Sequence, residues 1–219
     1  SASTYIRTTG RFLYRRDFDV FRLNLRDHGP SHHLNVGIFY AVLLDEVFDA
    51  VGQIAEAEKR QPVFLAGFSL GGNFALRIAS KSARQPINGL RQVVAISPVL
   101  DPDKATDRID GNRFIQAYFL NKWRRSLSIK ARLFPEIYDF SAIVGIDNIR
   151  EMTERLLASY SPYDSLKAYF KGYTLLGNDL NDITTPTTII TAADDPIIPV
   201  KDFYGLHTSP TTRLIVQPR

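Results

Sequence analysis

Apolar and polar positions in the first seventy residues follow the periods of strands and helices in turn. Residues 18–25 alternate between apolar and polar side chains and run into a turn-rich segment, which predicts a strand followed by a loop. Between residues 36 and 58, apolar side chains recur every three or four positions, which predicts a helix. The wholly apolar run 63–68 predicts a short strand of the buried parallel type.

The alternation continues over the next thirty residues. A helical pattern covers residues 73–82, and the segment 90–97 contains a second buried strand. Strands that alternate with helices in this way predict a mostly parallel sheet with right-handed crossovers, and therefore the α/β class.

The pattern changes between residues 101 and 170, where helical spacing replaces strand patterns, for example at 149–159. Strand patterns return at 187–192 and 213–216. We therefore expect helices on both faces of one sheet, interrupted by a helical cap insert at about 101–170.

Composition narrows the class of protein. A chain of 219 residues with 44% apolar side chains suits a single domain over residues 1–219. The absence of cysteine excludes a disulfide scaffold and thiol chemistry. The four histidines show no metal-ligand spacing, so neither a metal nor a cofactor is expected. No apolar run reaches the roughly 18 residues of a membrane span.

The net charge of +4 is concentrated in one segment. Residues 104–132 carry eight basic and two acidic side chains, but no nucleic-acid-binding motif accompanies them, so no nucleic-acid partner is expected. The segment is either a solvated helix face or a surface that attracts an anionic substrate or a membrane.

The sequence Gly-Phe-Ser-Leu-Gly-Gly-Asn at 67–73 fits G-x-S-x-G and lies between a predicted strand and a predicted helix. This context predicts a nucleophile elbow, in which Ser69 occupies a strained turn. Side chains at Gly67 and Gly71 are expected to collide in so tight a turn. The helix that follows directs its positive end at a developing oxyanion, and the Leu70 N–H is one expected donor.

An acid that follows the serine along the chain is needed to orient a base. Asp194 and Asp195 come directly after the strand predicted at 187–192, and the proline at 199 favours Asp195. Alternatively, both acids cap the turn into the next helix. Asp101 is the lesser alternative for the catalytic acid.

None of the four histidines suits the base. His207 precedes the last predicted strand, whereas His28, His32 and His33 precede the serine along the chain. The base is therefore expected just after Arg219, and a second oxyanion donor just before Ser1. We expect the chain to be truncated at both ends.

Together these residues resemble an α/β-hydrolase, in particular the YheT-like branch of predicted bacterial hydrolases. The resemblance rests on segments 67–73, 161–170, 193–197 and 24–31, where Asp27 replaces the usual glycine. It implies the α/β-hydrolase fold and an ester-type hydrolase. It also implies a His-Gly oxyanion loop upstream of the chain and a Gly-Gly-His segment downstream.

The first functional hypothesis is a serine esterase. Ser69 attacks an acyl carbonyl, an absent histidine takes its proton, and Asp195 orients that histidine. Acyl transfer to another alcohol uses the same residues. Aromatic side chains of the insert either line an acyl pocket or pack the cap on the core: Phe114, Tyr118, Phe119 and Trp123.

The second hypothesis is that the protein has the same fold but no catalytic activity, and that it binds a ligand or a protein partner. The expected partner of the enzyme is a small-molecule acyl ester, a class that includes lipid-like esters, and the basic cap allows a peripheral membrane contact. The expected location is the cytoplasm.

Overall fold

The computed structural model describes residues 3–58 and 61–218, and the chain divides into two compact units. The first unit comprises Ser1–Tyr40 with Tyr118–Asp147, and the second comprises Ala41–Ala117 with Asn148–Arg219. The terminal residues Ser1 and Arg219, beside which the sequence analysis expects missing parts, lie outside the described residues. The single domain with a cap stays a prediction.

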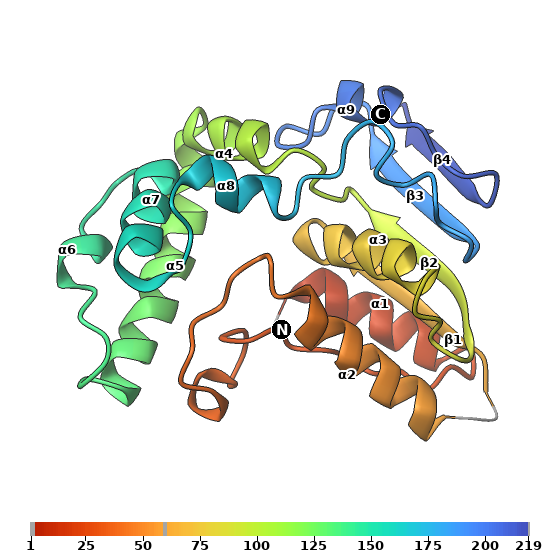
Figure 1. Ribbon diagram of the computed structural model, residues 1–219, viewed down its shortest axis with the longest axis horizontal. Coiled ribbons are helices and arrows are strands. Elements are labelled where there is room, and N and C mark those ends of the chain that lie inside the picture. The colour runs from red at the N-terminus through yellow and green to blue at the C-terminus, as the bar shows by residue number, and fades with distance from the viewer. Residues whose placement is uncertain (1–2, 59–60, 219) are drawn as a thin grey trace. The chain divides into compact units, whose positions relative to one another are not determined.

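The second unit contains a four-stranded sheet in the order β1-β2-β3-β4, in which every neighbouring pair is parallel (Figure 1). The strands are β1 (Val63–Phe68), β2 (Leu90–Ile96), β3 (Thr187–Ala192) and β4 (Thr212–Gln217). These bounds agree with the predicted strands, and the parallel order confirms the predicted α/β class.

Six helices accompany this sheet in the described part of the second unit, and α5 begins there. The six are α2 (Leu44–Ala57), α3 (Leu70–Ser82), α4 (Pro102–Asp110), α7 (Ile149–Tyr160), α8 (Leu166–Lys171) and α9 (Val200–Tyr204). Helix α3 packs on the sheet, where its Leu76 joins Val93 of β2 and Ile189 of β3 in a fully buried aliphatic core. Burial of these side chains is the main driving force for the layer.

Helix α2 begins at Leu44, eight residues later than the periodicity predicts. The reason is that the backbone before it is bound to side chains. The Ala41 N–H donates to the Tyr169 hydroxyl at 3.0 Å, and the Ala41 carbonyl accepts from Arg77 at 2.7 Å. Both groups are thereby unavailable to a helical hydrogen-bond ladder.

Two strand predictions are wrong in part. Residues 18–25 form no strand, and the four described strands pair with one another rather than with this segment. Strand β1 forms as predicted but lies at the edge of the sheet, where Phe64 is 48% exposed rather than buried. Periodicity reports which residues suit a strand, and pairing decides whether the ladder forms.

The first unit is helical and rich in loops. It contains α1 (Thr4–Tyr14), a short 3-10 helix (His32–Leu34), most of α5 (Arg113–Leu133) and α6 (Ser141–Val144). Residues 101–170, all of which the structure describes, contain helices and loops and no strand, as predicted. Their role as a cap stays a prediction.

Among residues 3–58 and 61–218, no helix is both long enough and apolar enough to cross a membrane.

Candidate functional site

Ser69 occupies the sharp turn between β1 and α3. Its backbone has φ 52° and ψ −120°, a left-handed conformation that non-glycine residues rarely adopt. The turn is fixed by hydrogen bonds, because the Ser69 N–H donates to Ile96 at 2.9 Å and its carbonyl accepts from Asn73 at 3.0 Å. The side chain is exposed. The geometry is that of a nucleophile elbow.

Two glycines make this turn possible, but they are not the pair that the sequence predicts. A Cβ on Gly67 would lie 2.1 Å from the Gly71 carbonyl oxygen, so no side chain fits there. A Cβ on Gly72 would lie 3.0 Å from Pro98. At Gly71 itself a Cβ would meet no atom within 4 Å, so the expected collision at Gly71 is wrong. Its carbonyl, rather than its Cα, fills the crowded space.

Helix α3 begins at Leu70, directly after the serine. The first N–H groups of a helix have no intrahelical acceptor, and they carry the positive end of the helix dipole. The Leu70 N–H is therefore placed to donate to an oxyanion beside Ser69, which remains the predicted role.

Asp195 is held by the loop that follows β3. Its Oδ1 accepts from the N–H groups of Ile197 and Ile198, both at 2.9 Å, and the residue is half-buried. Asp194 is exposed. The turn-capping alternative therefore holds for Asp195 Oδ1, and acceptance from a base through the other oxygen stays a prediction.

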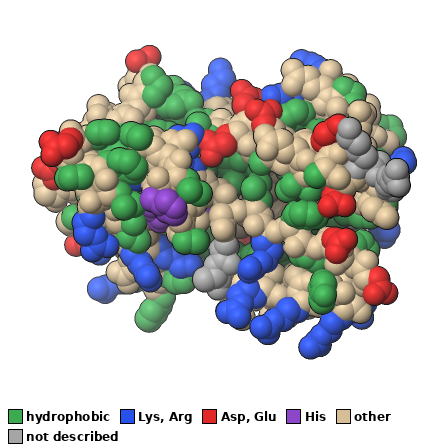
Figure 2. All heavy atoms as spheres, turned by 90° about the horizontal axis from the view of Figure 1, so that it is seen from below, with side chains coloured by type: hydrophobic (Ala, Val, Ile, Leu, Met, Phe, Trp, Pro, Cys, Tyr) green, Lys and Arg blue, Asp and Glu red, His purple; other side chains and the backbone are tan. Residues whose placement is uncertain are grey.

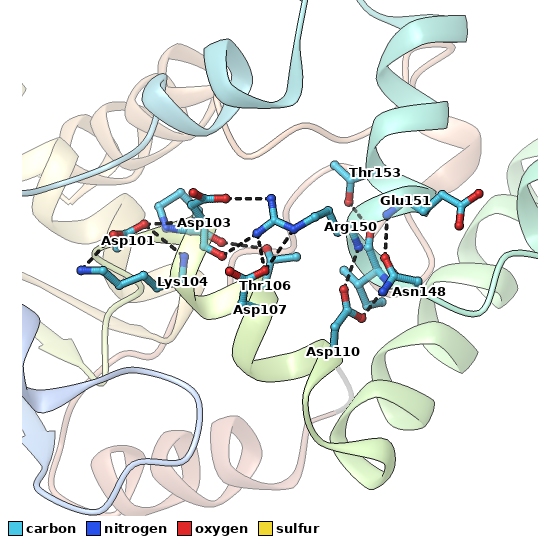
Figure 3. Close-up of polar contacts among 12 residues, drawn as sticks. Asp101, Asp103, Lys104, Thr106, Asp107, Asp110, Asn148, Arg150, Glu151 and Thr153 are labelled. Atoms are coloured by element: carbon cyan, nitrogen blue, oxygen red, sulfur yellow. Dashed lines mark hydrogen bonds and ion pairs between the residues drawn. The ribbon is translucent and has the colours of Figure 1, made fainter.

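Asp101, the lesser alternative, has both carboxylate oxygens engaged. Oδ1 caps α4 by accepting from the N–H groups of Asp103 and Lys104, and Oδ2 lies 3.2 Å from Lys104 Nζ (Figure 3). Figure 3 also shows Arg150 of α7 directed at Asp103 and Asp107 of α4. Asp101 thus caps α4, beside the ion pairs that join α4 to α7.

The sheet places the serine and the acid at the same edge. Phe68 pairs with Ile96, which pairs in turn with Ile190, so Ser69 and the loop after β3 both lie beyond the carboxyl ends of the strands. Binding sites of open α/β sheets lie at this edge. His207 is exposed and precedes β4, at the opposite end of that parallel strand.

The other three histidines belong to the first unit. His28 Nδ1 lies 2.8 Å from the Arg26 carbonyl oxygen, and its ring meets Phe39 edge-on. His32 is buried and its Nε2 lies 2.8 Å from the Ser126 hydroxyl. His33 is exposed.

The basic segment 104–132 is only partly a solvated face. Lys104 binds Asp101 and Asp202, and Lys130 is buried against Asp27. On the face shown in Figure 2, lysine and arginine side chains gather mostly along the lower edge. No group of three potential metal-binding side chains occurs within the described ranges.

The aromatic residues of α5 differ in their surroundings. Phe114 is 90% exposed and Tyr118 is 53% exposed, so neither side chain is packed into a core. Phe119 and Trp123 are half-buried. The acyl pocket stays a prediction for all four residues.

A family model described as serine aminopeptidase, S33, matches residues 1–216. The chain belongs to this family of α/β-hydrolases. A curated relative from Synechocystis sp., which carries the provisional name of an esterase, is 25% identical over 230 residues. That alignment covers 94% of the chain and 62% of the relative, so the chain spans less than two thirds of the relative's length.

Solved structures of low sequence identity share the fold. An esterase of Pyrococcus furiosus has a TM-score of 0.55 at 18% identity, over 99% of this chain and 67% of that one. A serine hydrolase of Cycloclasticus zankles has a TM-score of 0.53 at 16% identity, over 88% of this chain and 69% of that one. The predicted α/β-hydrolase fold is thus confirmed.

Proposed function

We propose that the whole protein is a serine-dependent carboxylic ester hydrolase of the YheT-like branch. Ser69 is its nucleophile, Asp195 its acid and the Leu70 N–H one oxyanion donor. The observation that carries the proposal is the strained serine at the start of α3, because such a turn exposes a hydroxyl beside unsatisfied helix N–H groups. The esterase name of the relative supports an ester substrate.

In the proposed mechanism, Ser69 Oγ attacks the ester carbonyl carbon while a histidine takes the hydroxyl proton. Asp195 accepts a hydrogen bond from that histidine through Oδ2, since Oδ1 is occupied by the loop. The tetrahedral intermediate collapses, the carbon–oxygen bond to the alcohol breaks, and the alcohol leaves with the proton. Water then attacks the acyl-enzyme, which releases the acid and restores the serine. Small acyl esters, including lipid-like ones, are the proposed substrates.

The test is labelling of the full-length protein with a fluorophosphonate, which forms a phosphoserine-type adduct with release of fluoride. We expect one adduct, located on Ser69 by peptide mass spectrometry and absent from Ser69→Ala. Ser97→Ala is the matched control, because Ser97 also has a positive φ (41°) and follows the neighbouring strand β2. Equal labelling of Ser69→Ala and wild type would exclude the mechanism.

The acid is tested by a second matched pair. Asp195→Asn is expected to lower p-nitrophenyl ester turnover by about 10³- to 10⁴-fold, because the histidine loses its orienting acceptor. Asp194→Asn, at the exposed neighbour, is expected to retain activity. The reverse order would assign the acid to Asp194, and full activity of both variants would exclude the loop.

A further inference from the structure

One fully buried polar side chain in the second unit has no role in the mechanism above. Asn73 lies one helical turn after Ser69 and has 0% exposure. Its Nδ2 donates to the carbonyl oxygens of Val99 at 2.8 Å and Tyr173 at 2.7 Å. Asn73 belongs to the elbow segment 67–73, but the sequence pattern alone predicted no function for it. A polar asparagine among the apolar positions of the predicted helix is the sequence signal that could have singled out Asn73.

The hydrogen bonds of Asn73 form a closed ring around the elbow. The Ser69 carbonyl oxygen accepts from the Asn73 N–H at 3.0 Å and from the Val99 N–H at 3.3 Å. The Val99 carbonyl oxygen in turn accepts from the Asn73 side chain. Both backbone groups of Val99 are therefore tied to the elbow, one through Ser69 and the other through Asn73.

The orientation of the Asn73 amide is fixed from its other side. Arg77, also buried, donates to Asn73 Oδ1 at 3.4 Å and to the Ala41 carbonyl at 2.7 Å. With its oxygen toward a guanidinium, the amide must direct its nitrogen at the two carbonyls. Rotation of the amide would place an oxygen against two oxygens in a site without water access.

We propose that Asn73 is a positioning residue for the nucleophile: it holds the loop after β2 against the strained turn of Ser69 and thereby fixes the direction of the serine hydroxyl. The argument rests on the proposed function of Ser69. A left-handed serine persists only where its surroundings determine it, and here the surroundings are three backbone hydrogen bonds and the Asn73 amide. Displacement of a nucleophile by about 1 Å can lower the rate by about 10²-fold.

The experiment compares isosteric variants in the full-length protein. Asn73→Leu removes both donors, and Asn73→Asp keeps the volume and an acceptor for Arg77 but removes the donors. For both, the maximal rate of fluorophosphonate labelling is expected to fall by roughly 10- to 100-fold, with the probe's half-saturating concentration unchanged within about twofold, because Asn73 touches no substrate. Thr153→Val is the control, since Thr153 is buried in α7 and its hydroxyl donates to the Ile149 carbonyl of the same helix.

The readouts separate positioning from stability. Each variant is melted, and labelling is measured far below its melting temperature, where Thr153→Val is expected to label like wild type. If Asn73→Leu does not fold, Asn73→Asp carries the test alone. Folded Asn73 variants that label within twofold of wild type would overturn the positioning role. A wild-type protein that does not label at Ser69 would instead overturn the proposed nucleophile.

Discussion

The two compact units satisfy their buried backbone in different ways. In the second unit, parallel strands pair their own N–H and carbonyl groups, and aliphatic side chains such as Ile189 fill the space between sheet and helix. In the first unit, Lys130 has 1% exposure and donates to Asp27 Oδ1 at 2.9 Å and to the carbonyls of His32 at 3.1 Å and Asn35 at 2.5 Å. In this segment the Lys130 ammonium group supplies the donors that neighbouring strands supply to backbone carbonyls in the second unit.

The difference follows from local structure. Residues 15–40 contain little regular secondary structure, so their carbonyls lack the donors that a helix or sheet supplies. A lysine carries three donors on a flexible stem and can reach carbonyls of irregular spacing. The cost is a buried charge, which Asp27 offsets. The first unit is therefore expected to depend on a single pair, whereas the second spreads its stability over many contacts.

The largest expected effect is loss of the buried ammonium. Lys130→Met leaves the Asp27 carboxylate buried without its partner, and removal of one member of a buried pair costs about 3–5 kcal/mol. We expect faster amide hydrogen exchange at residues 26–39, measured by mass spectrometry, with little change in β3.

The control for this experiment removes the charge from both partners. In Asp27→Asn/Lys130→Met the asparagine tolerates the positive φ of 56° and still accepts from the Phe39 N–H. The double variant is expected to regain much of the lost stability. A double variant as unstable as Lys130→Met would show that the donors to His32 and Asn35, rather than the charge balance, stabilise the loop.

In the second unit the corresponding change is Ile189→Ala. Ile189 is 0% exposed in the aliphatic core, and the cavity is expected to cost about 2–5 kcal/mol of unfolding free energy. Hydrogen exchange should here rise in β2 and β3 and not in residues 26–39. Equal acceleration in both segments would mean that the two units unfold together and that the comparison has no energetic counterpart.

Acid is expected to act on the first unit through His32. Burial lowers the pKa of His32 below its ordinary value of 6.5, against the opposing attraction of Asp27. Well above pH 6.5 the ring is neutral in both the folded and the unfolded state. Below it, the unfolded chain binds the proton more readily, so the unfolding free energy falls as the pH decreases toward the folded pKa.

The measurement is denaturant unfolding of wild type and His32→Gln between pH 7.5 and 5.5. The loss of stability over this range is expected to be smaller in the variant. His207→Gln is the control, because His207 is exposed and is the one histidine within the sequence of the second unit. If His32→Gln and wild type lose the same stability, His32 does not couple protonation to folding.

The sequence predicted the core of the second unit well, because its strands and helices are periodic and continuous. The elbow could be located from Gly67 and Ser69, since a strand, a tight turn and a helix follow one another locally. The strand at 18–25 could not be excluded, because pairing depends on a distant neighbour. The Lys130–Asp27 pair could not be predicted either, since the two residues lie 103 positions apart and lysine is usually exposed. The predicted steric collision at Gly71 was wrong, because the sequence does not show that the Gly71 carbonyl oxygen, and not its Cα, lies against Gly67.

The smallest effect is expected for an ion pair on the surface of the second unit. Arg84 lies 3.0 Å from Asp182, a distance close to that of the Lys130 pair, but the side chains of Arg84 and Asp182 are 83% and 63% exposed. Water screens both charges, and ordering of two long side chains opposes the attraction, so Arg84→Gln should change the unfolding free energy by about 0.5 kcal/mol or less. The loss should shrink further in 0.5 M salt, because exposed charges are screened while the buried pair is not. A change as large as that of Lys130→Met would show that distance alone, and not burial, determines the strength of ion pairs in this protein.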